Sequence, residues 1–140
     1  MMTVDGLLLD TCAVIWLSQD ARVAPAAKAA IERARKAKAT VGVSQMTAWE
    51  IGMLVSKDRL PAVKDAERWF EEFVERAAVV VWPLTTRVLV DSSFLPHFDH
   101  GDPMDRIVVA TARSNNLAIV TRDRLILAYG TAGHVRTVRC

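Results

Sequence analysis

Residues 6–11 have the sequence GLLLDT, and this short stretch is the best guide to the fold. Its first four residues are glycine and leucine, which is typical of a strand buried on both faces of a parallel sheet. We expect this strand to run from Gly6 to Asp10 and a helix to follow over residues 11–17. The carboxylate of Asp10 borders an apolar run, so it loses hydration and requires a compensating partner.

The rest of the chain alternates between strand-like and helix-like segments. Further strands are expected at residues 40–43, 79–82, 117–121 and 135–138. Helices are expected at residues 25–39, from the N-cap Ser44 onward, at 65–77 and 85–94, and from the N-cap Asp102 to about Asn115. This alternation predicts an α/β fold, in which helices cover both faces of a mainly parallel sheet of four to five strands.

The overall composition fits this fold. The chain has 140 residues, enough for a single domain over 1–140, and its 51% hydrophobic but only 6% aromatic content indicates an aliphatic core. It has two cysteines, which do not suggest a disulfide framework, and it shows no signal peptide or membrane span. We therefore expect a cytoplasmic protein with no membrane association.

The net charge is only +2, but the charges are unevenly distributed. Residues 22–38 hold six Lys or Arg and one acid, whereas acids are concentrated in residues 58–75. If a bound cation neutralises some of the other acids, the remaining surface is more basic than the formal sum suggests. Solvated helix faces explain any one of these Lys or Arg residues equally well.

Four acids lie at the edges of apolar segments: Asp10, Glu50, Asp105 and Asp123. Asp10 and Asp123 follow expected strands, and ligands of parallel sheets collect beyond the carboxyl ends of the strands. We therefore expect the four carboxylates to meet at one edge of the sheet. Such a cluster, without a matching cluster of Lys or Arg, favours a bound Mg²⁺ or Mn²⁺ ion.

Each acid also has a simpler structural interpretation. Asp10 can cap the following helix, and Asp123 can be a turn residue. Asp102 precedes Pro103 and is the better candidate for an N-cap, which leaves Asp105 as the better ligand. Glu50 is different, because no cation lies three or four residues after it to form a helical ion pair.

The histidines at 97 and 100 flank Asp99, but neither a Cys nor another His stands at zinc-binding spacing. We interpret both as loop residues near a substrate.

Taken together, these motifs resemble those of the PIN-domain ribonucleases, and among them the VapC-type toxins of bacterial toxin–antitoxin pairs. The motifs are Leu8-Leu9-Asp10-Thr11, Ser44 with Trp49-Glu50-Ile51, His100-Gly101-Asp102-Pro103-Met104-Asp105-Arg106, and Val120-Thr121-Arg122-Asp123. The resemblance extends from Leu7 to about Gly130. It implies an α/β/α sandwich and a Mg²⁺- or Mn²⁺-dependent endoribonuclease, commonly a homodimer, that is inhibited by a cognate antitoxin.

The resemblance also assigns residues. Asp10, Glu50, Asp105 and Asp123 match the acidic quartet of the family, and Asp102 matches an additional acid of the group with an Asp-Pro-x-Asp-Arg motif. That group usually has an aromatic residue where this chain has Met104, which is a conservative change in packing.

For the reaction, we expect Asp10 and Asp105 to be inner ligands of the metal, with Glu50 and Asp123 completing the site. A carboxylate-held cation lowers the pKa of a bound water and polarises the phosphate, so we expect products with a 5′-phosphate. Supporting hydrogen bonds are expected from Thr11 or Thr121. Arg106 or Arg122 is expected to contact either the phosphate of the RNA substrate or the antitoxin.

Two other functions use the same fold: a non-catalytic module that binds RNA or protein, and a structure-specific DNA nuclease. The intact quartet favours an enzyme, because a binding module gains nothing from clustered like charges. An aspartyl-phosphate hydrolase is excluded by Cys12, since that class has an Asp two residues after the first. A receiver domain is excluded because the expected third strand ends in Trp82-Pro83.

Overall fold

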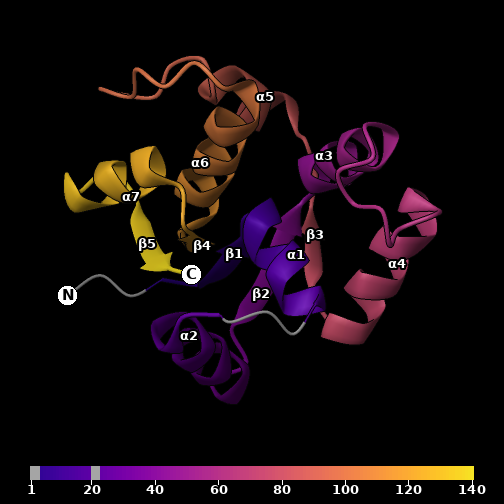
Figure 1. Ribbon diagram of the computed structural model, residues 1–140. Coiled ribbons are helices and arrows are strands. Elements are labelled where there is room, and N and C mark those ends of the chain that lie inside the picture. The colour runs from indigo at the N-terminus through magenta and orange to yellow at the C-terminus, as the bar shows by residue number, and fades with distance from the viewer. Residues whose placement is uncertain (1–3, 20–22) are drawn as a thin grey trace.

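The computed structural model describes residues 4–19 and 23–140, so Arg22 of the basic N-terminal segment lies outside the described residues. Within these residues, five parallel strands form one sheet in the order β3-β2-β1-β4-β5, as Figure 1 shows. The strands are β1 (Gly6–Leu9), β2 (Thr40–Ser44), β3 (Val80–Trp82), β4 (Leu117–Thr121) and β5 (Arg136–Arg139). The predicted parallel sheet is therefore confirmed.

The strand order has a switch point between β1 and β4. From β1 the chain builds outward through β2 to β3, then returns to β4 on the other side of β1 and continues to β5. Leu9 of β1 pairs with Val43 of β2 on one side and with Val120 of β4 on the other. The crevice beyond the carboxyl ends of β1 and β4 is where an open α/β sheet binds its ligand.

The described residues also form seven helices. They are α1 (Thr11–Ser18), α2 (Pro25–Lys36), α3 (Gln45–Ser56), α4 (Ala66–Ala77), α5 (Thr86–Asp91), α6 (Pro103–Asn115) and α7 (Arg124–Thr131). The N-caps expected at Ser44 and Asp102 are confirmed: each side chain accepts a hydrogen bond from a backbone N–H in the first turn. None of these helices has both the length and the apolarity to cross a membrane.

Several boundaries differ from the expectation, and α7 was not expected at all. The helix expected over 25–39 ends at Lys36, because Lys38 adopts a left-handed conformation with φ 57°. The helix expected over 85–94 spans only residues 86–91. The last strand lies at 136–139, one residue later than expected.

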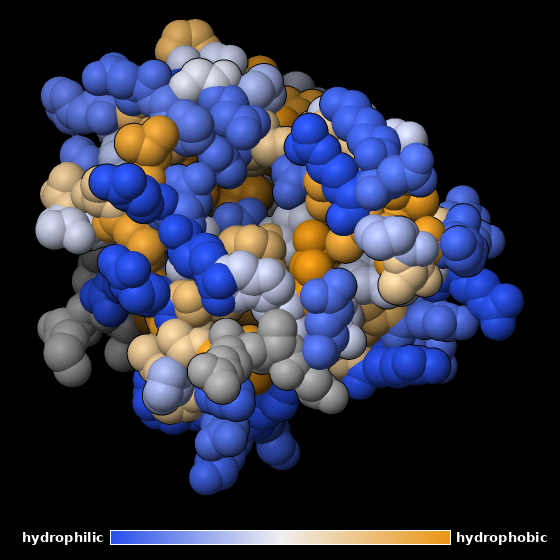
Figure 2. Space-filling view, viewed as in Figure 1, coloured by the Kyte–Doolittle hydropathy of each residue, from blue (hydrophilic) through white to orange (hydrophobic). Residues whose placement is uncertain are grey.

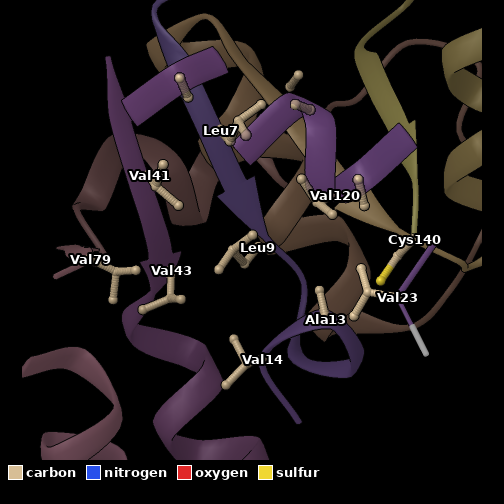
Figure 3. Packing of buried hydrophobic residues seen from close by; sticks show 14 of the residues in the cluster. Leu7, Leu9, Ala13, Val14, Val23, Val41, Val43, Val79, Val120 and Cys140 are labelled. Atoms are coloured by element: carbon tan, nitrogen blue, oxygen red, sulfur yellow. The ribbon is translucent and has the colours of Figure 1, made fainter. Parts of the chain in front are cut away.

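The leucines of β1 divide the core into two halves. Leu7 and Leu9 face a cluster with residues of α1, α2 and α4. Figure 3 shows both leucines among other members of this cluster, including Ala13 and Val14 of α1. Leu8 faces the opposite side and packs with residues of α5, α6 and α7. Burial of a leucine side chain stabilises the fold by roughly 1.5–3 kcal/mol. The three leucines of β1 therefore hold the helices on both faces firmly against the sheet.

Helix α3 lies at the carboxyl edge of the sheet, between the two helical layers. Its Ile51 is fully buried, while Ala48 packs against the core half of Leu7 and Leu9 and Met46 packs against the half of Leu8. This position brings the middle of α3, with Glu50, to the ends of the central strands. Figure 2 shows a hollow on this side of the surface, between the parts over α7 and over α3.

Candidate active site

Asp10 is the most enclosed carboxylate among the described residues. It follows β1 directly and caps α1, and only 7% of its surface is exposed. One carboxylate oxygen accepts a hydrogen bond from the Thr11 backbone N–H (2.8 Å), and the other accepts one from the Thr121 hydroxyl (2.7 Å). Both oxygens are thereby held in fixed directions.

Thr121, the last residue of β4, connects Asp10 with Asp123. Its buried hydroxyl donates to Asp10 and accepts a hydrogen bond from the Asp123 backbone N–H (3.0 Å). Asp123 is the N-cap of α7, and its Oδ1 accepts hydrogen bonds from the N–H groups of Leu125 (2.9 Å) and Ile126 (3.0 Å). The strand end therefore positions two carboxylates through one hydroxyl group.

Asp102 and Asp105 lie at the start of α6 and have different environments. Asp102 is exposed, and its Oδ1 accepts a hydrogen bond from the Met104 N–H (2.9 Å), which agrees with its expected role as an N-cap. The Asp105 side chain is only 14% exposed, and its Oδ2 lies 2.5 Å from Nε2 of His100.

Glu50 approaches the cluster from α3. It is half-buried, and the Thr11 side chain is close enough to lower the pKa of Glu50 by hydrogen bonding. The hydroxyl groups of Thr11 and Thr47, which lies one turn before Glu50 on α3, are also within hydrogen-bond distance, with 3.2 Å between their oxygens. Thr11 therefore links the end of β1 to the helix that carries Glu50.

Burial and mutual repulsion raise the pKa of three of these carboxyl groups. Burial is the largest cause in each case. The charge of Asp123 also raises the pKa of Asp10, and the charge of Asp10 raises that of Glu50. The pKa of Asp105 reaches about 6, because the repulsion from the other acids adds to its burial and outweighs the opposing hydrogen bond from His100.

These couplings show that Asp10, Glu50, Asp105 and Asp123 lie near one another, and carboxylate oxygens of Asp105 and Asp123 are within 4.8 Å of each other. Within residues 4–19 and 23–140, none of the four forms an ion pair with a Lys or Arg. Clustered carboxylates that repel one another and have no Lys or Arg partner are the oxygen-rich donor set that Mg²⁺ and Mn²⁺ bind. The cluster is therefore able to hold a divalent metal ion.

The two arginines expected near phosphate or antitoxin have other contacts in this structure. Arg106 donates from Nε to the Ser92 carbonyl (2.7 Å) and from Nη1 to the carbonyls of Phe98 (2.7 Å) and His100 (2.9 Å). These three hydrogen bonds occupy most of the N–H groups of the guanidinium, and they fix the backbone of the segment before α6. The guanidinium of the exposed Arg122 lies against the ring of Trp16.

The sequence analysis expected His100 only as a loop residue near a substrate, whereas the structure makes it part of the acidic site. Its ring nitrogen and carboxylate oxygens of Asp105 and Asp123 all lie within 4.8 Å of one another. In the sequence, His100 stands two residues before the N-cap of the helix that carries Asp105, but nothing there shows that its ring turns toward that acid. His97, by contrast, is exposed, and its ring lies 5.6 Å from that of His134.

Cys12 is beside Asp10 but does not add a reactive group. Burial and the charge of Asp10 raise the pKa of its thiol to about 11, so it remains protonated at neutral pH. The second cysteine, Cys140, is buried in the core near Ala13 and Val23, as Figure 3 shows.

Comparison with known proteins agrees with this geometry. Residues 7–130 match the sequence profile of the PIN domain. Ribonuclease VapC22 of Mycobacterium tuberculosis (strain ATCC 25618 / H37Rv) is 28% identical over 124 residues, which cover 88% of this chain and 91% of the relative.

Two solved structures share the fold at low sequence identity. The VapBC2 complex of Rickettsia felis, bound to a DNA fragment from its promoter, aligns with a TM-score of 0.67 and 14% identity over 96% of this chain and 98% of that one. The FitAB complex bound to an IR36 DNA fragment aligns with a TM-score of 0.55 and 21% identity over 95% and 94% of the two chains. From the profile match over most of its length, this chain belongs to the PIN-domain family.

Proposed function

We propose that this protein is a divalent-metal-dependent endoribonuclease and the toxin of a toxin–antitoxin pair, with residues 1–140 acting as one domain. The observation that carries this proposal is the cluster of Asp10, Glu50, Asp105 and Asp123 at the switch point of a PIN fold, which pairs with no Lys or Arg among the described residues. The similarity to a relative named as a VapC ribonuclease supports the choice of RNA as substrate.

Asp10 and Asp105 would be the main ligands of the ion, assisted by Asp123. A bound divalent cation supplies positive charge that polarises a phosphate and lowers the pKa of a water molecule. Asp10 needs little rearrangement, because Thr11 and Thr121 already hold both of its oxygens. Such preorganisation lowers the cost of assembling the reacting groups.

Glu50 would act on the water that attacks the phosphate. Burial and the nearby acids raise its pKa, so Glu50 holds a proton more readily than an ordinary glutamate. Because this route does not use the 2′-hydroxyl of RNA, the products would carry 5′-phosphate and 3′-hydroxyl ends.

The partners follow from the same proposal. The substrate would be single-stranded RNA in the cytoplasm, where a cognate antitoxin would bind the toxin and inhibit it. Both of the structural neighbours described above are named as pairs, VapBC2 and FitAB, which supports an antitoxin partner. Two copies of the chain would form a homodimer.

The test is cleavage of single-stranded RNA by the purified protein with Mg²⁺, with Mn²⁺ or with a chelator. We expect cleavage with metal only, and a loss of at least about a hundredfold in Asp10→Asn and Asp105→Asn. The matched control is Asp65→Asn, because Asp65 caps α4 away from the cluster and Asn is an equally good cap.

Each alternative function predicts a different result. Binding of RNA without cleavage at any metal concentration would favour a non-catalytic module. Preferential cleavage of DNA flaps would favour a structure-specific DNA nuclease. RNA products ending in a 2′,3′-cyclic phosphate would contradict the metal-activated water.

A further inference from the structure

His100 differs from the other groups around the cluster because it offers nitrogen rather than oxygen. Its Nε2 and the carboxylates of Asp105 and Asp123 form the one group of three His, Cys, Asp or Glu ligands with metal-binding spacing in the described part of the chain. One ion with bonds of about 2.1 Å bridges ligand atoms up to about 4 Å apart, so small side-chain movements bring all three atoms onto one ion.

The imidazole is held in place toward this cluster. The His100 carbonyl accepts a hydrogen bond from Arg106 Nη1 (2.9 Å), which fixes the backbone of the residue. Its ring packs edge-on against the buried ring of Phe98, with 5.8 Å between the ring centroids and an interplanar angle of 89°. The ring itself is largely shielded, since the His100 side chain is 21% exposed.

We propose that His100 is a metal ligand together with Asp105 and Asp123, and that it makes the site select Mn²⁺ over Mg²⁺. This inference rests on the metal-dependent function proposed above and specifies its ion. Mg²⁺ favours oxygen ligands and retains several of its waters, so an imidazole contributes little to its binding. Imidazole suits first-row transition metals, and Mn²⁺ accepts it alongside carboxylates.

A purely structural role makes a different prediction. If His100 only donates a hydrogen bond to Asp105, its removal would change Mn²⁺ and Mg²⁺ binding to the same extent. If His100 ligates the ion, its removal would selectively weaken Mn²⁺ binding. The ratio of the two affinities therefore distinguishes a ligand from a positioning residue.

The experiment measures metal binding by the full chain without RNA. Mn²⁺ binding is followed through the loss of the free-ion electron paramagnetic resonance signal, and Mg²⁺ binding by calorimetry. We expect His100→Ala to weaken Mn²⁺ binding about tenfold or more and Mg²⁺ binding less than about threefold. The control is His97→Ala, which removes a nearby exposed histidine of the same loop and is expected to leave both affinities unchanged.

A second readout detects the nitrogen directly. Electron spin echo modulation of the Mn²⁺-loaded protein should show coupling to ¹⁴N in the wild type and in His97→Ala, and none in His100→Gln. The Gln variant also guards against misfolding of the Ala variant, because it keeps a polar side chain of similar reach.

The outcomes separate this inference from the proposed function. If the wild type binds Mn²⁺ and cleaves RNA but shows no nitrogen coupling, His100 is not a metal ligand. The metal-dependent function would still stand. Equal weakening of both ions in His100→Ala would lead to the same conclusion. A wild type that binds neither ion would overturn both this inference and the metal-dependent function.

Discussion

At the residue scale, the site depends on the hydroxyl groups of threonines that adjoin the acids. Thr121 holds Asp10 and the backbone of Asp123 at once, and Thr11 connects β1 to α3 through Thr47. The sequence indicated both threonines because they adjoin the acids in the two motifs. It placed His100 in a loop near a substrate but did not predict its contact with Asp105, because the approach of the His100 ring depends on how Arg106 holds the preceding loop.

Asp105 gives a prediction about pH. Its pKa is about 6 in the folded protein, against an ordinary value of 3.8. The folded chain therefore binds this proton more tightly than the unfolded chain, and the metal-free protein should lose stability as pH rises from about 4 to about 7. After allowance for solvent screening of a partly buried group, the loss is about 1–2 kcal/mol.

Urea unfolding of the metal-free protein at pH 4 and pH 7 measures this effect. Between pH 4 and pH 7, the free energy of unfolding of Asp105→Asn should fall by about 1–2 kcal/mol less than that of the wild type. The variant should therefore gain stability relative to the wild type as the pH rises to 7. An identical pH dependence in the two proteins would contradict the raised pKa. The comparison with the variant is needed because Asp10 and Glu50 also have raised pKa values.

At the element scale, the strands were easier to predict than the helices that follow them. The strand at 117–121 was predicted with its observed bounds, because five apolar or β-branched residues lie between Asn116 and Arg122. Helix α7 was missed because Asp123 was interpreted as a ligand or a turn residue, although it is also the N-cap of that helix. The short α5 was predicted too long, and the structure ends it at Asp91, just before Ser92 and Ser93.

The two roles of Asp123 can be separated by substitution. Serine retains the N-cap but removes the carboxylate, whereas alanine removes both. We expect Asp123→Ala to be about 1 kcal/mol less stable than Asp123→Ser in the metal-free protein, because only serine accepts hydrogen bonds from the first turn of α7. Both variants should lose RNA cleavage.

The control for this pair is Asp65→Ala, which removes the N-cap of α4 away from the cluster. It should lose a similar free energy of unfolding while still cleaving RNA. Cleavage by Asp123→Ser at the rate of the wild type would show that Asp123 is only a cap. Chemical denaturation and the RNA assay together test both roles.

At the scale of the whole molecule, the alternation of strands and helices predicted the parallel sheet, but it did not predict the order of the strands. The order matters for function, because the switch point between β1 and β4 brings Asp10 and Asp123 to one crevice although they are far apart in sequence. The sequence of each strand or helix determines only which of its own faces is buried. The position of β4 beside β1 depends on packing across the whole sheet.

The surface also gives a prediction about assembly. Three hydrophobic side chains from α5 and the turn after it are exposed: Leu89 (42%), Val90 (52%) and Phe94 (78%). An exposed apolar group of this kind favours association, and we expect it to contact a second copy. Light scattering after size-exclusion chromatography should give a dimer for the wild type and a monomer for Phe94→Glu.

The control for assembly is Leu125→Glu, which introduces the same charge at an exposed leucine of α7. It should remain dimeric. A dimer of Phe94→Glu as stable as that of the wild type would place the dimer interface elsewhere.

Thermal unfolding with and without metal tests most directly whether the acidic cluster binds a divalent ion. A cation that binds only the folded chain at about a hundred times its dissociation constant adds about 2.7 kcal/mol, or roughly 5–10 °C for a domain of this size. We predict this rise for the wild type with Mn²⁺, and no rise for the double variant Asp10→Asn with Asp105→Asn. An unchanged melting temperature in the wild type, or an equal rise in the variant, would contradict the assignment of the cluster as a metal site.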